Sequence, residues 1–563
     1  MSTSTITEVF PPLRVDSEQD VQWAQQCDVL VVGWGAAGAS TAIEAHDQGL
    51  DVLVTDRFEG GGASAKSGGV VYAGGGTEQQ RKAGFTDSPK AMFEYLKHET
   101  QGVVSDATLR RFCDQSAANL RWLEAMGTPY THSMPPGGKT SYPQDGYYLY
   151  YSGNELVPAY RGAGEPPPRG HRTVGKGHGG VVLYGHLQAA CRKRGIRSLT
   201  QSAVRCLVMD SSGRVLGAEV WSLPAGKVAR QHARLARRAE KLQNLAPGYC
   251  NRLRQKLSAL EKQHASPQLI RARKGVVLST GGFIFNKELV KEHAPKYRRN
   301  FKIGATGCDG SGLRLGQSVG AATQRLDTVS AWRFINPPQK WPKGIAVNAK
   351  GERFSNEEVY GATLGHAICE EQNGKAWLIL DKPLRRQAIR QCLLGRYWWF
   401  QSVPALVMML LGAKKGRTPA ELARKTGMDP ASLDLALNAY NRAISEGLPD
   451  PQGKSDDSRQ PLRQGPFYAL DISVSSPVLP LGALTLGGLK VDETSGNVLG
   501  EQGVPIPGLY AAGRAAVGIP SNLYVSGLSL ADCIFSGRRA GAALASEARQ
   551  QSVHTTGEAL TTA

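Results

Sequence analysis

The chain has 563 residues, with 67 Lys and Arg against 48 Asp and Glu, which gives a formal net charge of +19 at pH 7. Its 66 glycines gather in short turns and follow no period, so collagen-like and low-complexity classes are excluded. The length allows two domains and a large core. Because no run of about 18 uncharged apolar residues is present, we expect no transmembrane helix.

Residues 1–25 are polar and rich in Ser and Thr, and we predict a tail without an apolar signal sequence. The nine cysteines are scattered, and none belongs to a CxxC pair. This spacing favours unpaired thiols in a reducing compartment and disfavours zinc or iron–sulfur ligation. We therefore expect a cytoplasmic protein with no metal site.

The first chemical motif follows an apolar strand at Val29–Val32. The run Gly33-x-Gly35-x-x-Gly38 then opens an Ala-rich helix, a pattern in which the glycines give a tight turn, close backbone approach to phosphate and close helix–strand packing. A second strand ends at Asp56, 21 residues after Gly35 (56 − 35), where a carboxylate can accept both hydrogen bonds of an adenosine ribose. Taken alone, this Asp fits a helix cap or a turn equally well. We assign to cofactor binding Gly33, Gly35, Ala36, Ala37, Gly38, Asp56 and Arg57.

Three further small-residue segments fit the same cofactor. Residues 60–69 follow the ribose carboxylate directly and would let an isoalloxazine ring and a pyrophosphate lie against backbone, although such a run also fits a flexible linker. A buried strand then ends in Thr-Gly-Gly, and a later Thr-Gly-Cys-Asp-Gly run opens a helix with its Asp as the predicted cap. The candidates are Ser64, Ser67, Gly68, Gly69, Thr280, Gly281 and Asp309.

Residues 226–274 hold 13 Lys and Arg and two Glu, a net charge of +11 in that stretch. Helix-forming residues flank Pro247-Gly248, which predicts a helical hairpin inserted between two strands. A solvated charged hairpin and a surface for an anionic membrane or acidic partner both remain open. No interleaved aromatics accompany the charge, so nucleic-acid binding is disfavoured. We expect the hairpin to be dispensable for cofactor binding.

Near the end of the chain, Gly508-Leu-Tyr-Ala-Ala-Gly513 predicts another strand. The run Tyr524-Val-Ser526-Gly527-Leu-Ser529-Leu530 predicts a second helix start that could close over the same cofactor. A nicotinamide domain normally completes its site within one half of the chain, whereas this site needs both ends, which indicates FAD. Gly513, Ser529 and Leu530 join the cofactor candidates.

The ordered set of motifs resembles the fumarate reductase/succinate dehydrogenase flavoprotein superfamily. The set also includes Gly344-Ile-x-Val-Asn348 and Arg353-Phe-x-Asn356-Glu357, and it spans nearly the whole chain except the basic hairpin. The resemblance implies an α/β fold with a Rossmann-like FAD-binding domain and an inserted α+β capping domain for substrate. The implied boundaries are 1–25 (tail), 26–334 and 476–550 (FAD-binding domain, with the insertion 226–274), 335–475 (cap) and 551–563 (C-terminal tail).

Departures from the family pattern indicate the branch. Dicarboxylate enzymes of the family clamp substrate carboxylates with an arginine and a histidine near this C-terminal run, but none stands between Arg514 and Arg538 here. The histidine that tethers FAD covalently in some members is also missing from residues 63–69, so we expect non-covalent FAD. The Tyr-x-Ser-Gly run instead is similar to that of 3-ketosteroid dehydrogenases of the Δ4-(5α) type. In that type a second active-site tyrosine follows the Asn-Glu of the cap, the place of Tyr360.

The resemblance implies desaturation of a 5α-3-ketosteroid to the 4-ene-3-ketosteroid. Flavin N5 would accept the hydride, while Tyr524, Ser526 and Tyr360 would act as catalytic base, relay and enolate donor. Each tyrosine also fits simple packing at a domain seam. The alternatives are a Δ1-dehydrogenase, a fumarate-reductase-like flavoprotein and, last, a non-enzymatic FAD-binding protein. The physiological electron acceptor is not indicated.

The segment from Tyr397 to Leu411 is strongly apolar, and Lys414-Lys415-Gly-Arg417 follows it. It is too short and too broken by Pro404 to span a bilayer. A buried cap helix explains it. So does a mouth that makes peripheral membrane contact and admits a sterol-like substrate, with basic residues at headgroup level.

Overall fold

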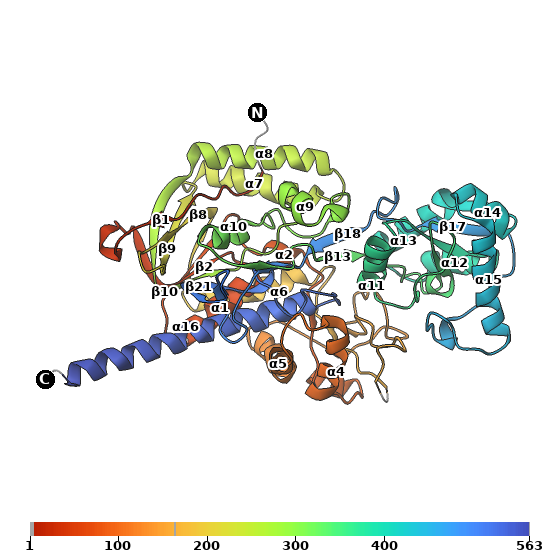
Figure 1. The fold of residues 1–563 in the computed structure, drawn as a ribbon, viewed down its shortest axis with the longest axis horizontal. Helices are drawn as coiled ribbons and strands as arrows, with labels where there is room; N and C mark the ends of the chain where they lie inside the picture. Colours follow the sequence, from red (N-terminus) through yellow and green to blue (C-terminus); the bar gives the residue numbers. More distant parts are fainter. Residues whose placement is uncertain (1–4, 163–164, 562–563) are drawn as a thin grey trace.

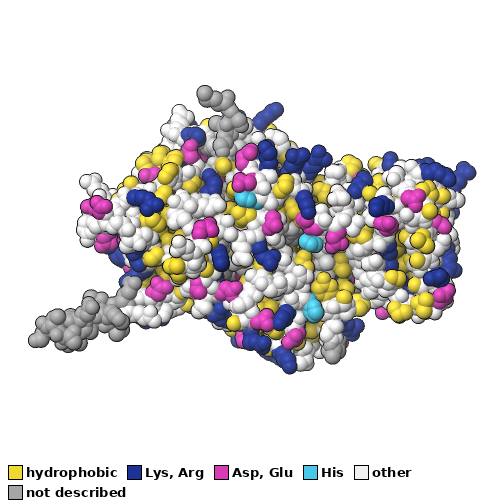
Figure 2. Space-filling model, in the orientation of Figure 1, with side chains coloured by type: hydrophobic (Ala, Val, Ile, Leu, Met, Phe, Trp, Pro, Cys, Tyr) yellow, Lys and Arg dark blue, Asp and Glu magenta, His cyan; other side chains and the backbone are white. Residues whose placement is uncertain are grey.

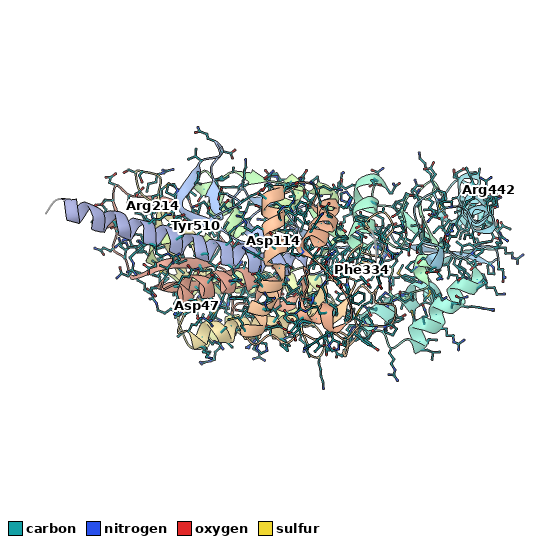
Figure 3. All side chains as sticks on the ribbon, turned by 90° about the horizontal axis from the view of Figure 1, so that it is seen from below. Asp47, Asp114, Arg214, Phe334, Arg442 and Tyr510 are labelled. Carbon is teal, nitrogen blue, oxygen red and sulfur yellow. The ribbon has the colours of Figure 1, made fainter. Side chains whose placement is uncertain are left out.

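The computed structural model describes residues 5–162 and 165–561, with side chains described as far as residue 550. A large lobe holds both ends of the chain, and a smaller cap projects from it (Figure 1). In the view from below, Phe334 lies where the two lobes meet, whereas Arg442 marks the far end of the cap (Figure 3). This arrangement is the predicted α/β architecture, a sheet-centred domain with an inserted cap.

A nine-stranded sheet forms the centre of the large lobe. Its strands are β1 (Leu13–Arg14), β8 (Ser202–Met209), β9 (Val215–Ser222), β10 (Ser266–Leu278), β2 (Gln25–Val32), β3 (Val52–Asp56) and β7 (Arg197–Thr200), with β21 (Pro505–Ala511) and β20 (Asn497–Leu499) beyond β10. β10 begins antiparallel to β9 and ends parallel to both β2 and β21. β3 and the later parts of β2 and β10 are near-continuous apolar runs because both of their faces are covered.

Helices cover this sheet on both faces (Figure 1). In the large lobe they are α1 (Ala36–Asp47), α2 (Gly62–Lys66), α3 (Glu78–Lys82), α4 (Pro89–Thr100), α5 (Asp106–Ala125), α6 (Gly180–Lys193), α9 (Lys287–His293), α10 (Ser311–Ser318) and α16 (Leu528–Thr561). α16 packs along α1, and Phe535 meets Phe112 of α5 edge-to-face at 5.4 Å. The last part of the chain thus lies beside its first helix, which brings the two predicted halves of the cofactor site together.

A smaller sheet consists of β4 (Val70–Tyr72), β6 (Gly170–Arg172) and β5 (Leu149–Tyr150). The junction with the cap contains β11 (Phe301–Lys302), β18 (Gly482–Thr485) and β13 (Val329–Trp332), and β12 (Thr323–Gln324) pairs with β19 (Gly488–Leu489). Short 3₁₀ and π segments are η1 (Glu18–Asp20), η2 (Pro295–Tyr297), η3 (Trp341–Lys343), η4 (Ala367–Glu371), η5 (Met408–Gly412), η6 (Asp456–Ser458) and η7 (Gly513–Ala515).

The cap is built on the antiparallel sheet β14 (Ile345–Asn348), β15 (Ala376–Leu380), β17 (Phe467–Asp471) and β16 (Lys414–Gly416). Around it lie α11 (Gly361–His366), α12 (Lys382–Leu394), α13 (Trp399–Val407), α14 (Pro419–Thr426) and α15 (Pro430–Ser445). In its interior Glu357 pairs with both Arg353 (2.8 Å) and Lys454 (2.6 Å). The Arg-Phe-x-Asn-Glu motif therefore stabilises the cap from inside.

The basic insertion folds as α7 (Lys227–Leu242) and α8 (Pro247–His264), between β9 and β10. Its exposed surface is basic, and dark-blue side chains gather along the upper edge of Figure 2 over these helices. Its inner surface is not a solvated charged face, however. Glu261 is buried and pairs with Arg57 of the large lobe, Nε to Oε1, at 2.9 Å. The insertion is therefore packed into the lobe, which differs from the expected dispensable module.

Both predicted tails differ from their expected form. Thr7 is buried, with its backbone N–H and hydroxyl donating to Asp309 Oδ2 at 2.7 and 2.6 Å, and β1 pairs with β8. A buried carboxylate needs such donors, so the N-terminal segment is held on the lobe from residue 7 onward. At the other end α16 continues as helix to Thr561, and residues 562–563 lie outside the described part. Within the described ranges, no helix is long and apolar enough to cross a bilayer.

Candidate active site

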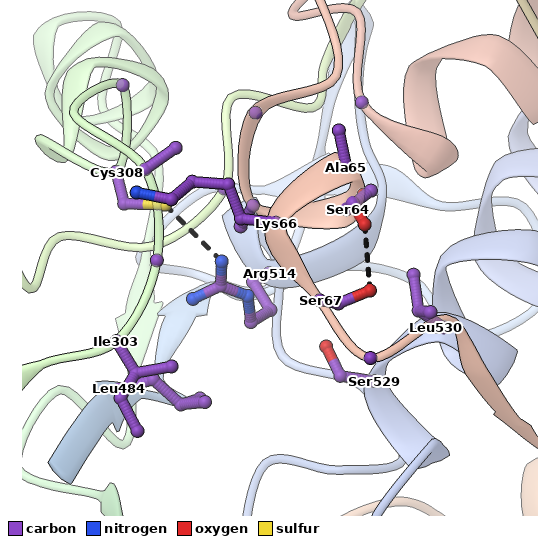
Figure 4. Close-up of a pocket in the computed structure, with 18 of the residues that line it drawn as sticks. Ser64, Ala65, Lys66, Ser67, Ile303, Cys308, Leu484, Arg514, Ser529 and Leu530 are labelled. Atoms are coloured by element: carbon purple, nitrogen blue, oxygen red, sulfur yellow. Dashed lines mark hydrogen bonds between the residues drawn. The ribbon is translucent and has the colours of Figure 1, made fainter. Parts of the chain in front are cut away.

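A cavity of about 810 Å³ lies between the large lobe and the cap. One end is lined by the turn between β2 and α1, and the other by β13, the segment before α16 and the cap helix α13. Figure 4 shows its middle, where Ser64 and Ser67 from the front of the chain face Ser529 and Leu530 from the start of α16. Its volume lies in the range of small-molecule and cofactor sites.

The turn after β2 is possible only with glycine. Gly33 has a φ of +102°, and a Cβ there would stand 2.7 Å from the Ser279 carbonyl oxygen. At Gly38 a Cβ would stand 2.0 Å from the Gly33 carbonyl oxygen, so α1 packs directly against the turn that precedes it. The N-terminus of α1 consequently opens onto the cavity, where its N–H groups and dipole favour an anion.

Two polar side chains stand at this end of the cavity. Asp56 accepts from the backbone N–H of Trp34 through Oδ2 and of Phe58 through Oδ1, both at 2.8 Å. Burial raises the pKa of Asp56, and these backbone bonds act in the opposite direction. Ser64 Oγ accepts the N–H of Ala36 at 3.0 Å, in the first turn of α1. The arrangement leaves acceptor capacity on Asp56 for a ribose diol.

Most of the predicted cofactor residues line this cavity: Gly33, Gly35, Ala36, Ala37, Asp56, Arg57, Ser64, Ser67, Gly68, Thr280, Gly281, Ser529 and Leu530. Gly38, Gly69, Asp309 and Gly513 are not among its lining residues. A Cβ at Gly513 would meet Ala37 Cβ at 2.8 Å, and one at Gly69 would meet the Gly179 carbonyl carbon at 2.2 Å. These glycines therefore allow close packing of the segments behind the cavity wall.

Asp309 differs from its predicted role. Its Oδ1 accepts the N–H of Ser311, as predicted for a cap, but its Oδ2 is taken up by Thr7 and by Arg57 at 3.0 Å. Arg57 in turn pairs with Glu261 of α8. Burial lowers the pKa of a guanidinium, but the two carboxylates outweigh it and raise the pKa of Arg57 above its usual value. Asp309 and Arg57 thus connect Thr7 and α8 behind the cavity wall, and Arg57 also lines the cavity.

The basic hairpin contributes to the same wall. Ala236, Arg237 and Glu240 of α7, and Asn244 just after its end, line the cavity. Glu240 accepts the backbone N–H of Thr306 at 2.6 Å and also pairs with Lys66. This geometry argues against the expectation that the insertion is dispensable for cofactor binding, because one of its helices forms part of the cavity wall.

At the other end the three predicted catalytic residues, Tyr524, Ser526 and Tyr360, all line the cavity. The Tyr524 ring is stacked on Trp332 of β13, with centroids 5.5 Å apart and an interplanar angle of 22°. Two hydrogen bonds to Ser152 fix the backbone of Ser526. The Ser526 N–H donates to the Ser152 carbonyl at 3.1 Å, and the Ser526 carbonyl accepts from Ser152 Oγ at 3.0 Å. These contacts hold the Tyr-x-Ser run against the wall.

Tyr360 reaches the site from the cap side. Its N–H donates to Asn154 Oδ1 at 2.6 Å, and its ring meets Phe334 edge-to-face at 5.5 Å. A further tyrosine, Tyr150 of β5, has its hydroxyl 3.3 Å from Ser526 Oγ. Three hydroxyl groups therefore lie at one end of the cavity, and that of Tyr150 stands behind Ser526.

The tyrosines differ in acidity. Enclosure by protein raises the pKa of Tyr524 to about 12, and the nearby Arg514 charge limits that rise. Burial raises the pKa of Tyr360 well above its usual value, the neighbouring Tyr524 adds to the rise, and the Ser526 hydroxyl opposes it. Tyr524 is therefore the hydroxyl of the two that most readily loses its proton.

Arg514 is a residue that the sequence reasoning missed. It lines the cavity, and its Nη2 donates to Cys308 Sγ at 3.3 Å (Figure 4). Its other terminal nitrogen, Nη1, is buried with no hydrogen-bond partner among the described residues. A buried guanidinium N–H without a partner is costly, so this nitrogen indicates an acceptor supplied by a ligand.

Other missed residues are the aromatic walls Trp332, Phe334, Phe400 and His178, and Tyr150 behind Ser526. Two of them carried a sequence signal: Tyr150 lies in a Tyr-Tyr-Ser-Gly run near other small-residue motifs, and Phe400 lies in the apolar segment 397–411. Trp332, Phe334 and His178 come from segments with no motif, so tertiary structure alone reveals them.

The residues present fit FAD. A glycine turn and the N-terminus of α1 suit a pyrophosphate, Asp56 suits a ribose, and the unpartnered Arg514 nitrogen and the start of α16 lie further along the same cavity. Comparison with known proteins agrees with this fit. A family model described as an FAD binding domain matches residues 28–527.

The chain is 49% identical over 525 residues to a 3-oxo-5-alpha-steroid 4-dehydrogenase of Comamonas testosteroni, covering 91% of this chain and 96% of the relative. It is 26% identical to a 3-oxosteroid 1-dehydrogenase of Mycolicibacterium smegmatis, covering 89% and 94% of the two chains.

The crystal structure of a 3-ketosteroid-delta4-(5alpha)-dehydrogenase from Rhodococcus jostii RHA1, in complex with 4-androstene-3,17-dione, superimposes with a TM-score of 0.79 at 29% identity. That match covers 95% of this chain and all of the other. These matches confirm the resemblance found in the sequence. The chain belongs to the family of flavoproteins with the FAD binding domain that matches residues 28–527.

Proposed function

We propose that this protein is an FAD-dependent dehydrogenase that oxidises a 5α-3-ketosteroid to the 4-ene-3-ketosteroid. The observation that carries the proposal is the 49% identity to a 3-oxo-5-alpha-steroid 4-dehydrogenase along nearly the whole of both chains. The site supports it independently, because a ketone needs hydroxyl donors and the cavity offers Tyr524, Ser526 and Tyr360 where dicarboxylate enzymes need cations.

The reaction removes a proton from C4, next to the C3 carbonyl, and a hydride from C5, and a double bond forms between these two carbons. Bound FAD supplies the hydride acceptor. The protein must therefore accept one proton, stabilise negative charge on the carbonyl oxygen and exclude water.

Tyr524 takes the C4 proton in this proposal. Burial raises the pKa of Tyr524 to about 12, and the Arg514 charge opposes that rise and so stabilises a phenolate, while the stacked Trp332 ring holds the phenol in one orientation. The hydroxyls of Ser526 and Tyr360 stand beside it. The Ser526 hydroxyl donates to the carbonyl oxygen, and the Tyr360 hydroxyl relays the proton. Tyr150 supports Ser526 from behind.

The walls suit a rigid apolar substrate. Trp332, Phe334, Ile303, Leu484 and Phe400 line the part of the cavity that lies toward the cap. Such walls keep water from the reacting carbons and strengthen the hydrogen bonds made inside. Phe400 of α13 also stacks on His178 at 5.4 Å, which closes the cap against the large lobe at this point.

FAD would be held without a covalent bond, by Gly33, Gly35, Asp56, Ser64 and the start of α16, since no histidine stands in residues 63–69. Acid precipitation of the purified holoprotein is expected to release all of its yellow chromophore into the supernatant. Flavin that stays with the pellet would contradict non-covalent binding.

The decisive test of function is anaerobic mixing of the holoprotein with 5α-3-ketosteroids and with 4-ene-3-ketosteroids. We expect the 5α-3-ketosteroids to bleach the flavin absorbance and to yield a 4-ene product by mass and ultraviolet spectra. A 1-ene product would favour the related 1-dehydrogenases. Reoxidation of the reduced enzyme by fumarate would favour a dicarboxylate reductase, and no bleaching by any steroid would favour a non-catalytic flavoprotein.

We also propose that the protein makes peripheral contact with a membrane and that the reduced flavin passes its electrons to a separate acceptor.

A further inference from the structure

One side of the cap carries a concentration of exposed apolar side chains. Of the large apolar residues that are exposed in the described chain, six fall between positions 393 and 411. They are Leu393, Leu394, Trp399, Val403, Leu410 and Leu411, and we call them the apolar cap face. Trp399 is 70% exposed and Leu411 is 83% exposed. Large exposed side chains gathered in this way mark an interaction surface.

The apolar cap face is surrounded by positive charge. Between Asp381 and Glu421 the sequence has eight Lys and Arg and no Asp or Glu. Six of these basic residues are exposed, and none of the six has an ion pair among the described residues: Arg386, Arg390, Arg396, Lys414, Lys415 and Arg417. The acidic Asp145 of an adjacent loop is taken up by Arg172 at 2.6 Å. On the face of the cap shown in Figure 2, dark-blue side chains lie along the upper and outer edges and yellow ones lie mostly below them, with some magenta side chains between.

The positions share a helical face. Arg386, Arg390, Leu393 and Leu394 follow the i, i+4, i+7, i+8 spacing on α12, so they lie along one side of that helix. On α13, which packs against α12, Trp399 and Val403 are one turn apart. Apolar and basic residues thus point outward together from two neighbouring helices.

The inner side of α13 lines the cavity with Phe400, Gln401, Pro404 and Ala405. A single helix, about 10 Å across, therefore separates the apolar cap face from the candidate active site. An apolar substrate that dissolves in lipid would reach the cavity beside this helix without crossing bulk water.

We propose that the apolar cap face docks on an anionic phospholipid bilayer, with Trp399 and its apolar neighbours at the headgroup–acyl boundary and the surrounding Lys and Arg on the lipid phosphates. This combination of an apolar face with flanking basic residues is the pattern of interfacial binding. The advantage of docking rests on the proposed steroid substrate, but the docking itself does not.

The α7–α8 hairpin is the competing surface, since it is also basic. It exposes only Leu245 and Tyr249 among large apolar residues, both near its tip. It can therefore attract anions, but it has little to insert. If the apolar cap face binds the bilayer, variants of the cap lose vesicle binding, whereas variants of the hairpin lose it if the hairpin is the binding surface.

The test is co-sedimentation of the holoprotein with phosphatidylcholine vesicles that contain, or lack, phosphatidylglycerol. We expect sedimentation with the anionic vesicles only, weakened by salt. The double variant Trp399→Ser/Leu411→Ser is expected to weaken binding at least tenfold. Lys414→Gln/Lys415→Gln is expected to weaken it severalfold, and more so at low salt. The matched control Leu435→Ser/Val504→Ser removes two exposed apolar side chains elsewhere and is expected to bind as the wild type does.

Several results would overturn the proposal. They are absence of binding to anionic vesicles, equal weakening by the control, or loss of binding in Arg234→Gln/Arg238→Gln with the cap variants unaffected. A dimer in solution that Trp399→Ser disperses would assign the face to a second copy of the chain instead. Flavin reduction by a cyclodextrin-solubilised steroid, measured in the same variants, separates the two proposals. Vesicle binding needs no steroid, and the variants are expected to keep that activity.

Discussion

The two ends of the cavity are built in different ways. At the end near β2, the walls are backbone: a glycine turn, the start of α1 and a carboxylate fixed by two N–H groups. At the end near the cap, the walls are side chains: Tyr524, Trp332, Tyr360 and Phe334, from separate segments and in mutual ring contact. Backbone geometry tolerates little change of sequence, whereas a set of side chains can be exchanged to suit another substrate.

The largest expected effect lies at the side-chain end. Tyr524→Phe removes one oxygen and keeps the ring stacked on Trp332, so fold and flavin content are expected to stay unchanged. If the phenol takes the C4 proton, the rate of flavin reduction by a 5α-3-ketosteroid falls on the order of 10²–10⁴-fold. Stopped-flow absorbance under anaerobic conditions measures this rate.

Tyr440→Phe is the matched control. It removes the same oxygen from a cap tyrosine that is buried, donates to the Lys343 carbonyl at 3.1 Å and does not line the cavity. We expect its reduction rate to equal that of the wild type. A Tyr524→Phe enzyme as fast as this control would remove Tyr524 from the proton transfer.

The contrast between the two ends also explains what the sequence could reveal. The cofactor end was predictable because Gly33, Gly35 and Asp56 occur at fixed spacings that backbone geometry imposes. At the substrate end, Tyr524, Ser526 and Tyr360 were named only through the family resemblance. Trp332 and Arg514 stand in no motif, and their positions depend on how β13 and the segment after β21 fold back on the cavity.

The hairpin shows a different limit. Its net charge and its Pro-Gly turn were legible, and they predicted the two helices that are observed. The role of the hairpin could not be predicted from its sequence. The residues that join it to the lobe, Glu240 and Glu261, are the two acidic residues in a basic stretch. Averaged charge conceals isolated residues of opposite sign, and here those residues make the buried contacts.

Glu261→Gln tests that role and has the next largest expected effect. It leaves the buried His232 without its carboxylate and Arg57 with Asp309 as its one remaining carboxylate, and breaking a buried pair costs roughly 3–5 kcal/mol. We expect a lower melting temperature and partial loss of FAD. Glu446→Gln, which breaks an exposed pair with Arg442, is expected to leave both unchanged.

The same pair has a pH signature. Burial alone would raise the pKa of Glu261, but Arg57 and His232 lower it to about 2. The stability that this carboxylate contributes is therefore fully present above its unfolded pKa of about 4.3 and is lost as pH falls toward 2. Acid unfolding of the wild type is expected to be steeper in this window than that of Glu261→Gln. Identical acid profiles would contradict the coupling.

A smaller effect is expected at the backbone end. Gly33→Ala forces a side chain into φ +102° and against the Ser279 carbonyl, at a cost of about 1–3 kcal/mol. FAD affinity is expected to fall roughly ten- to a hundredfold, as measured by fluorescence titration of the apoprotein. Gly49→Ala is the control, because Gly49 has a similar φ of +93° but nothing within 4 Å. If both variants bind FAD equally, the turn at Gly33 does not hold the cofactor.

The last prediction joins the two ends, because Arg514 lies between them. Its charge lowers the pKa of Tyr524, against the larger effect of burial, which raises that pKa to about 12. Below this pKa the phenolate fraction grows about tenfold per pH unit, so the wild-type reduction rate is expected to rise with pH and not to level off below about pH 11. Arg514→Met removes the charge, which raises the pKa of Tyr524 further, and it is expected to slow reduction about tenfold at each pH without changing the slope. Arg514→Lys is expected to recover most of the rate.

Rates are compared at full flavin occupancy, since Arg514 also lines the cofactor cavity. A flat pH profile in the wild type would exclude Tyr524 as the base, and an Arg514→Met profile that coincides with the wild type would exclude the charge as its source of acidity.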